Sequence, residues 1–597
     1  TSYTLSVATL TFSEAPPLDS AIQIRYFTDV QLGTSTSADL VSYSQGSTGH
    51  VTRTVEARLR DHVSVLDYGA VGDGTTDDTV AINAALLAAA GGTIVFPEPS
   101  VYYLVSGNLI VYSDTNVVGL GLCLFMLAYN SNADVFRSYL PQIGAARNKN
   151  IKIRNITINA NAGTNGANQP PHPSYGWKPY ANINAIAACR MTNVDNLLIE
   201  DCHFYNAIGY GLELKSVTDY VVQRCKFSAC GDDGFSNSDG SFGSSARGRI
   251  LYCTAYDNGR PYTLSGNSGF EVDDGPDDLL FSHCFAYDNF GRGFEIHIHT
   301  GKTDAIKGIT YSHCSALNNN APAGYTYRSN YGFGIDGIAS TAYTARITYS
   351  HCYSTGHDNT EMDIGPSDTA GGLGTFVTID NCTLEGVDTG TLISSEKKLI
   401  KIAGCDQVTI TNNDFSYVYS SESCTGIRGY NVNKNVTITG NTSKGLSQEV
   451  YLPGDPTNGV ILYSNNTATK PQGGPNAGTS SVFLYNAWSV TVSGNNIEVD
   501  STLYESGISL NSGTTRVSAT SNVVRGVPTG AIKYPSYGIT VGNKVSSQNS
   551  LNTCINWWSG VYASGSSSVL VGNCCPGCTN AKWPASSTGQ YVQGNLT

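Results

Sequence analysis

The stretch "LLIEDCHF" (Leu197 to Phe204) carries the pattern that decides the fold. Two apolar residues stand two positions apart, a cysteine follows three positions later, and another apolar residue comes two positions after it. The same register returns along the chain, with cysteine and later asparagine at the fixed position. The residues at this position are Cys202, Cys225, Cys253, Cys284, Cys314, Cys352, Cys382, Asn413, Asn441, Asn466, Asn495 and Asn522.

Successive members of this series are 23 to 38 residues apart. A repeat of this length with two or three short strands is typical of a parallel β-solenoid. Because alternate residues of a strand point inward, we predict that the cysteines stack inside the coil as reduced thiols. The later asparagines are predicted to form a side-chain amide ladder where the coil bends. For "NCCPGC" (Asn573 to Cys578), packing or a local disulfide is favoured over zinc, because further ligands are missing nearby.

Composition excludes several classes of function. The 597 residues include 34 Lys plus Arg against 47 Asp plus Glu, a net charge of −13, so we expect no nucleic-acid partner and no anionic membrane partner. Only 14% of residues are charged, whereas 64 are glycine and 36 tyrosine, which favours β-structure with many turns. No run of about 18 apolar residues occurs, so we expect no membrane insertion.

The ends of the chain differ from the repeat. Residues 1–50 are predicted to form a small β module, 51–110 a connector and cap, 111–530 the parallel β-helix with a catalytic face, and 531–597 the C-terminal coils or cap. Within the cap, Thr76 or Asp77 begins a short helix that Gly91 and Gly92 end. Such a helix would cover the open end of the solenoid. The chain starts at Thr1 without a methionine, so we expect an N-terminal piece to be missing.

Residues 64–86, "SVLDYGAVGDGTTDDTVAINAAL", resemble the opening of the pectate-lyase-like, right-handed β-helix proteins. With "LTFSEAPP" (residues 10–17), "IQIRYF" (22–27) and "TRTVEARLRDHVSV" (52–65) in front, the combination resembles bacteriophage tailspikes. The resemblance covers residues 1–110 by motif and the rest by repeat pattern only. It implies an all-β, right-handed parallel β-helix in a homotrimeric virion fibre that binds, and usually cleaves, a polysaccharide on the host cell surface. The missing N-terminus would dock to the phage tail.

Catalytic residues must come from the coils, because tailspikes share no single catalytic signature. Coils aligned on a Gly-aromatic start, such as "GFEVD" (Gly269 to Asp273) and "GFEIH" (Gly293 to His297), place the phenylalanines inward. One outward column is then predicted to hold Glu213, Ser236, Glu271, Glu295, Gly334 and Glu361. The next outward column is predicted to hold Lys215, Ser238, Asp273, His297, Asp336 and Asp363.

Stacked carboxylates repel one another, which raises the pKa of at least one of them, as a general acid requires. Glycosidases need two carboxyl groups, about 5 to 5.5 Å apart for retention of configuration or about 6.5 to 9.5 Å for inversion. Glu271 and Glu295, one rung apart, approximate the first spacing. Asp273 and Asp336, two rungs apart, approximate the second, so the stereochemistry stays open. We predict these four residues to be catalytic.

Further residues near the grid are predicted to bind substrate. Outward histidines can hold a sugar hydroxyl or act as a base, and tyrosines in the long insertion "NNNAPAGYTYRSNY" (residues 318–331) can stack on sugar faces. The predicted substrate-binding residues are His297, His299, Glu361, Asp363, Tyr325 and Tyr327.

Other interpretations of the acidic stretch remain open. It can be an ordinary solvated acidic face, or "DDGPDD" (Asp273 to Asp278) can form an irregular Ca²⁺ site, although the hydrolase interpretation needs no cofactor. A zinc pair of His297 and His299 is a weaker alternative. Asp232 and Asp233 in "CGDDG" resemble the paired aspartates of polygalacturonase-type β-helices, although the other motifs of that family are not evident.

Three functions compete. The leading one is a tailspike depolymerase, a glycoside hydrolase acting on a bacterial capsule or O-antigen with paired carboxylates. A polysaccharide lyase of the same fold is the second, although the grid is poor in the Lys and Arg that would neutralise a uronate. The third is a receptor-binding spike without catalysis.

Overall fold

A computed structural model of the chain describes most of the repeat and parts of the ends. The described residues are 3–6, 9–12, 38–39, 41–129, 131, 133–139, 146–162, 186–240, 243–259, 268–298, 306–320, 330–337, 345–365, 375–387, 396–418, 423–430, 433–469, 480–499, 504–511, 513–527, 536–542, 546–557, 559–563, 567–571, 573–578 and 591–593. The chain forms two compact units, residues 1–61 and 62–597. No helix within these described ranges is long and apolar enough to cross a membrane.

Within its described residues, the first unit contains two small antiparallel pairs and one helix. Strand β1 (Tyr3–Ser6) pairs with β2 (Thr9–Phe12), and β3 (Ser42–Tyr43) pairs with β4 (Arg53–Thr54). The helix α1 (Val55–Leu59) is N-capped by Thr54, whose hydroxyl oxygen accepts a hydrogen bond from the Ala57 amide at 3.0 Å. The predicted helical connector is therefore present.

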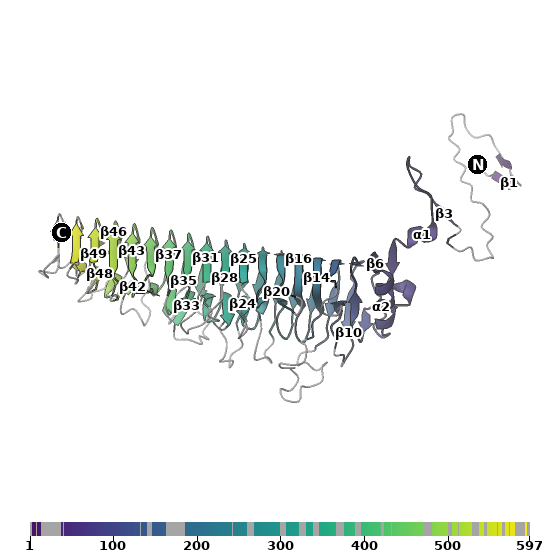
Figure 1. Cartoon of the computed structure of the whole chain (residues 1–597), viewed down its shortest axis with the longest axis horizontal. Coiled ribbons are helices and arrows are strands. Elements are labelled where there is room, and N and C mark those ends of the chain that lie inside the picture. The colour runs from purple at the N-terminus through teal and green to yellow at the C-terminus, as the bar shows by residue number, and fades with distance from the viewer. Residues whose placement is uncertain are drawn as a thin grey trace. The chain divides into compact units, whose positions relative to one another are not determined.

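The second unit is a parallel β-helix (Figure 1). A middle coil runs through β20 (Thr254–Tyr256), β21 (Ser268–Asp273) and β22 (Asp277–Ser282) before the next coil begins at β23 (Phe285–Tyr287). Each of these strands pairs in parallel with its counterpart one coil further on. The predicted fold of stacked coils with two or three short strands each is confirmed.

The strands form two long sheets. One has sixteen short strands, from β7 (Tyr103–Val105) to β50 (Thr553–Ile555), and includes β20 and β23. The other has 33 strands in two parallel series, which we call the first and second series of the long sheet. Around the site the first series is β16 (Leu212–Gln223), β18 (Phe235–Ser238), β21, β24 (Arg292–Ile298), β27 (Tyr331–Gly337), β30 (Thr360–Ile364), β33 (Glu396–Ala403), β36 (Ser423–Tyr430), β39 (Gln448–Pro453) and β42 (Ser480–Tyr485). The neighbouring second series is β19 (Ala246–Leu251), β22, β25 (Ile306–Ser312) and β28 (Ala345–Ser350).

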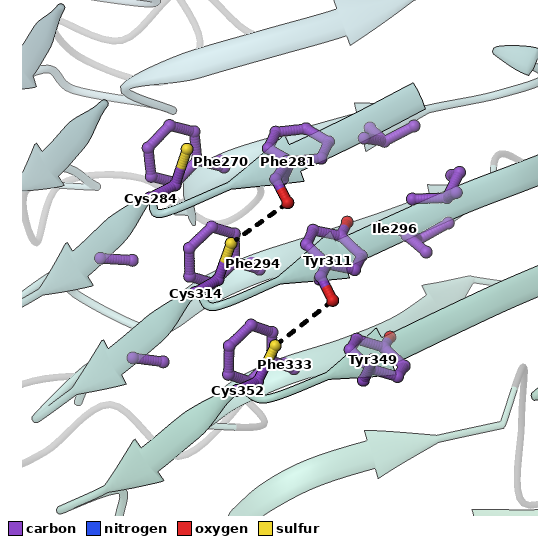
Figure 2. Packing of buried hydrophobic residues seen from close by; sticks show 14 of the residues in the cluster. Phe270, Phe281, Cys284, Phe294, Ile296, Tyr311, Cys314, Phe333, Tyr349 and Cys352 are labelled. Carbon is purple, nitrogen blue, oxygen red and sulfur yellow. Dashed lines mark hydrogen bonds between the residues drawn. The ribbon is translucent and has the colours of Figure 1, made fainter. Parts of the chain in front are cut away.

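The interior of the β-helix is one continuous apolar core. Figure 2 shows Phe270, Phe294 and Phe333 stacked in successive coils, with ring centroids 4.9 and 4.8 Å apart. The cysteines lie beside them, and the Cys314 thiol donates to the Phe281 carbonyl of the preceding coil at 3.5 Å. All sixteen cysteines are free and fourteen are buried, so the predicted internal stack of thiols is confirmed.

The predicted asparagine ladder is also confirmed. From Asn413 to Asn573, the side-chain Nδ2 of each asparagine donates to the side-chain Oδ1 of the next one at 2.8 to 3.1 Å. A second ladder, which the repeat did not reveal, runs from Asn258 to Asn289 and Asn319 along the corner between the short-strand sheet and the first series. Both ladders satisfy buried backbone amides at bends, where strand pairing cannot do so.

The helix α2 (Thr79–Ala88) packs Ile82, Ala85 and Leu86 into the same core, as expected of a cap. Its first turn differs from the prediction, because Asp78 is the N-cap residue. The Asp77 carboxylate accepts from the Thr79 amide at 3.0 Å, while the Asp78 carboxylate accepts from the amides of Val71 and Gly72. Asp78 thus fixes the preceding loop against the helix.

Candidate functional site

Two outward columns of the first series gather the acidic residues. In the register of β21 with β24, Glu271 lies opposite Glu295 and Asp273 opposite His297. In the next pair, β24 with β27, Glu295 lies opposite Gly334 and His297 opposite Asp336. The predicted register of these three coils is therefore confirmed, with Phe270 and Phe294 turned into the core between the acids.

The register predicted for β30 is wrong by two residues, that is, by one outward column. Met362 pairs with Phe333 and continues the inward column of that residue in the core. Glu361 therefore does not occupy the outward column that was predicted for it. Asp363 consequently lies opposite Gly334, in the column of Glu295 rather than in that of Asp336. "TEMD" lacks the Gly-aromatic start by which the coils were aligned, and its methionine is the inward residue.

Glu361 points into the corner of the coil instead of outward, and its side chain is fully buried. Its carboxylate lies 2.5 Å from His357 Nδ1 and 3.0 Å from Lys397 Nζ, and it accepts a hydrogen bond from the Ser354 hydroxyl at 2.8 Å. His357 Nε2 lies 3.1 Å from Asn319 Nδ2, at the end of the second asparagine ladder. Glu361 is therefore part of an internal cluster rather than of the outward face.

Glu271, Asp273 and His297 form the centre of the outward site. His297 Nδ1 lies 3.5 Å from Asp273 Oδ1 and 3.9 Å from Glu271 Oε1. The side chain of Glu271 is 8% exposed, that of Asp273 16% and that of His297 30%, so access increases from the glutamate to the histidine. The Ser236 hydroxyl donates to Glu271 Oε2 at 3.1 Å and fixes that carboxyl group from the preceding coil.

Burial raises the pKa of Glu271 well above its ordinary value, and the neighbouring carboxylates of Asp233, Asp273 and Glu295 raise it further. Asp233, in the loop before β18, is buried and accepts a hydrogen bond from the Ser268 amide at 2.6 Å. Burial and the neighbouring carboxylates thus favour the protonated form of Glu271. Asp233 was absent from the predicted site, and its signal in the sequence was the pair of aspartates in "CGDDG".

Glu295 has a different environment from Glu271. Its side chain is fully buried and contacts the guanidinium of Arg292 and the hydroxyl of Ser268. Arg292 lies in turn against the ring of Tyr331, with Cζ 5.5 Å from the ring centroid. A cation and a hydroxyl donor therefore both contact the Glu295 carboxyl group, whereas Glu271 is surrounded by other carboxylates.

Several predicted residues cannot be placed by their side chains. His299, Tyr325 and Tyr327 lie outside the described residues. For Asp336 the structure gives the backbone pairing with His297 and no side-chain position. These four assignments stay predictions.

One metal-binding arrangement is present among the described residues. Glu271, Asp273 and His297 offer ligand atoms that all lie within 4.8 Å of one another, and no other group of three or more such side chains does so in the described ranges. The later acids of "DDGPDD" are not part of it, since Asp278 instead lies 3.4 Å from Arg249. Two carboxylates and an imidazole form a donor set that suits a divalent cation.

The fold and the acidic face define a class of protein, and family models agree with it. The model "Rhamnogalacturonase A/epimerase, pectate lyase-like" matches residues 62–245, and the model "Right handed beta helix region" matches residues 183–360. These matches agree with the right-handed parallel β-helix of the second unit, and the first of them is to a model described as pectate lyase-like.

Individual relatives connect this β-helix with bacteriophage proteins. The chain is 26% identical over 267 residues to the pre-neck appendage protein of Bacillus phage B103, a match that covers 43% of this chain and 30% of the relative. It is 29% identical over 116 residues to the capsule K1-specific depolymerase of Klebsiella phage K64-1, covering 19% of this chain and 12% of the relative. The chain thus spans under a third of the length of these two relatives.

A solved structure shares the fold along most of the chain. The tailspike protein of E. coli bacteriophage HK620, solved in complex with a pentasaccharide, superposes with a TM-score of 0.51 and 13% identity. The match covers 86% of this chain and 85% of the tailspike. At this level of identity the similarity supports the fold.

Proposed function

We propose that the protein is a bacteriophage tailspike that binds a bacterial surface polysaccharide and hydrolyses its glycosidic bonds at the outward site. The observation that carries the proposal is Glu271, a buried carboxyl group with a raised pKa beside the more accessible Asp273. A neutral acid and a second carboxylate are the two groups that glycoside hydrolysis requires. The matches to a phage depolymerase and to a rhamnogalacturonase-type family model support the same reaction class.

In this mechanism Glu271 donates its proton to the glycosidic oxygen as the bond to the leaving sugar breaks. Asp273 activates a water molecule or attacks the sugar carbon, and His297 orients it from 3.5 Å. Glu295 lies one coil beyond Glu271 and raises the pKa of that residue, which favours the protonated form that a general acid needs. Asp336, whose backbone lies beside His297, is the second candidate partner in this column.

The remaining parts of the proposal concern assembly and place. We assign the protein to the phage virion as a homotrimer attached through a virion-proximal N-terminal region, because both the appendage protein and the tailspike that it resembles are phage proteins. Light scattering of the purified chain in solution tests the trimer, and a monomeric mass would refute it.

The test of the reaction uses purified capsule and lipopolysaccharide from a bacterial strain on which the protein produces a clearing zone. New reducing ends without ultraviolet absorbance are expected from hydrolysis. Absorbance from an unsaturated sugar would instead show a lyase, with His297 as the candidate base. Glu271→Gln should lower turnover about 10²- to 10⁴-fold, the range for loss of a general acid.

Glu385→Gln is the matched control. Glu385 belongs to the short-strand sheet, where Tyr353 donates to it at 2.9 Å, and its replacement should leave turnover unchanged. Full activity of the Glu271→Gln variant would show that the chemistry takes place elsewhere.

A further inference from the structure

The outward column that holds Glu271 and Glu295 changes character further along the β-helix. After Asp363 the same column continues with a lysine, an arginine and two aromatic residues, and the next column contributes two tyrosines. We call these residues the aromatic platform. They are Lys401, Arg428, Tyr430, Tyr451, Phe483 and Tyr485.

The rings and cations of the platform are in contact with one another. Tyr451 and Phe483 stack with centroids 5.2 Å apart at 17°, and Tyr485 lies 5.4 Å from Tyr451 in an edge arrangement. The guanidinium of Arg428 lies 3.8 Å from the centroid of Tyr451 and 5.7 Å from that of Tyr430. The platform is therefore a stack of rings in which Phe483 covers one face of Tyr451 and the Arg428 guanidinium covers the other.

The hydrophobic core does not account for this surface. The inward residues of the same strands, Ile427, Val450 and Val482, are buried in the continuous core, whereas the platform residues are half-buried on the opposite face of the strands. Half-exposed rings beside cations are the groups that stack on sugars and bind carboxylates.

Charge divides the face into two parts. Asp233, Glu271 and Glu295 crowd together at one end, and a sugar carboxylate placed there would be repelled. At the other end Lys401 lies 3.3 Å from Asp363 and 5.8 Å from the centroid of Tyr430, next to the coil of Arg428. In a chain of net charge −13, this cationic surface on the outward face has the sign that an anionic ligand needs.

We propose that the aromatic platform binds an acidic sugar of the polysaccharide, with its ring packed against Tyr451, Phe483 and Tyr485 and its carboxylate paired with Arg428. The proposal rests on the proposed function and names the substrate class: a polysaccharide with a carboxylate-bearing sugar. Five coil steps separate Glu271 from Arg428, about 24 Å at the usual strand spacing. The sugar at the cleaved bond is accordingly neutral, and the acidic sugar lies several units along the chain.

The experiment uses the whole chain carrying Glu271→Gln, so that binding is measured without cleavage. The probes are bacterial oligosaccharides that contain glucuronate, galacturonate or neuraminate, each paired with its carboxyl-reduced neutral form. We expect the acidic forms to bind, and Arg428→Gln to weaken them by about 10- to 100-fold, the loss for a charge-assisted contact. Tyr451→Ala should weaken the acidic and the reduced forms alike.

Arg516→Gln is the matched control, because Arg516 also lies over an aromatic ring, Trp488 at 4.5 Å, but outside the platform. It should bind the acidic probes like the parent protein. Equal binding of acidic and reduced probes, unchanged binding by Arg428→Gln, or no binding of any acidic probe would overturn the proposal.

Failure of the proposed function gives a different result. Acidic probes that bind through Arg428 but yield no reducing ends with the unmodified protein would refute hydrolysis and leave the platform assignment standing. Cleavage of a neutral polysaccharide would support hydrolysis and refute the assignment of the platform to an acidic sugar.

Discussion

Two pairs of buried glutamates lie in neighbouring columns of the first series, on different coils, and have opposite surroundings. Glu271 and Glu295 face outward, where carboxylates stand close together and a histidine is within reach. Glu361 and Glu449 face the inner corner, in a column that glycines occupy in coils such as that of Gly293. Burial is nearly complete for all four glutamates, so burial alone does not mark the site.

The two inner glutamates differ from each other through their partners. Burial would raise the pKa of Glu361, but the charges of Lys397 and His357 and hydrogen bonds outweigh it and lower that pKa to about 2. Burial raises the pKa of Glu449 to about 7, because the Ser443 hydroxyl alone opposes it. The inner pair therefore contains one stabilised ion and one neutral acid, each inside a closed coil.

The two outward glutamates also differ in their partners. Glu271 has the raised pKa, while Glu295 meets Arg292. Solvent reaches this pair beside the partly exposed Asp273 and His297, whereas the inner pair lies inside closed coils. A candidate catalytic acid in this fold is therefore recognised by a raised pKa together with a partly exposed neighbour.

The largest effect is expected from Lys397→Met. Lys397 is buried and lies 3.0 Å from Glu361, so its removal leaves a buried carboxylate with too little compensation. The free energy of unfolding should fall by about 3 to 5 kcal/mol. Denaturant unfolding measures it, and amide hydrogen exchange in β30 and β33 reports whether the loss is local.

Lys401→Met is the matched control for this prediction. Lys401 pairs with Asp363 at 3.3 Å on the outward face, and its side chain is 20% exposed against 1% for Lys397, so its removal should cost less stability than that of Lys397. Similar losses in both variants would contradict the distinction between the inner and outward columns.

A stabilising effect is expected from Glu449→Gln. The folded pKa of about 7 exceeds the ordinary value of 4.5, so the unfolded chain releases its proton first as pH rises. This carboxyl group therefore has no effect on stability below pH 4.5, and it lowers stability progressively between pH 4.5 and 7. Above pH 7 the loss is about 3 kcal/mol, which the glutamine should restore. Unfolding at pH 4 and pH 8 measures it.

Glu361→Gln should change the free energy of unfolding in the opposite direction. A folded pKa of about 2 means that ionised Glu361 stabilises the fold above pH 4.5, and that this contribution is lost as pH falls toward 2. The glutamine should therefore destabilise the protein at pH 8. If Glu449→Gln and Glu361→Gln both stabilised the protein, the buried partners of the two glutamates would not explain their pKa values.

The sequence predicted the β-helix because its signals are local and repeated. Apolar residues two apart and a small residue at a fixed position specify the inward column of every coil, so "LLIEDCHF" sufficed to find the cysteine stack. The register of β21, β24 and β27 followed from the Gly-Phe start that these strands share.

Other features depend on contacts between coils that no local pattern encodes. Met362 replaces phenylalanine in the core, which moved Glu361 inward and Asp363 to another column. Asp233 reaches Glu271 from a loop one coil earlier, and the aromatic platform joins residues of four coils. Pairing registers of this kind become visible only when the coils are stacked.

The smallest effect is expected from Gly332→Ala, which tests why glycines fill the corner column. A Cβ at Gly332 would lie 2.1 Å from Ser354 Oγ and 2.9 Å from His357 Cε1, so the internal cluster must shift to admit it. We expect a loss of about 1 to 3 kcal/mol in the free energy of unfolding, the usual cost of overpacking. The methyl group also displaces Ser354 from the Glu361 carboxylate, so part of the loss should disappear at low pH, where that carboxylate becomes protonated. Gly92→Ala is the control, because its Cβ would meet its nearest neighbour, the Ala89 carbonyl oxygen, at an ordinary 3.6 Å. If the two alanine variants had the same free energy of unfolding, crowding would not explain why glycines occupy the corner column.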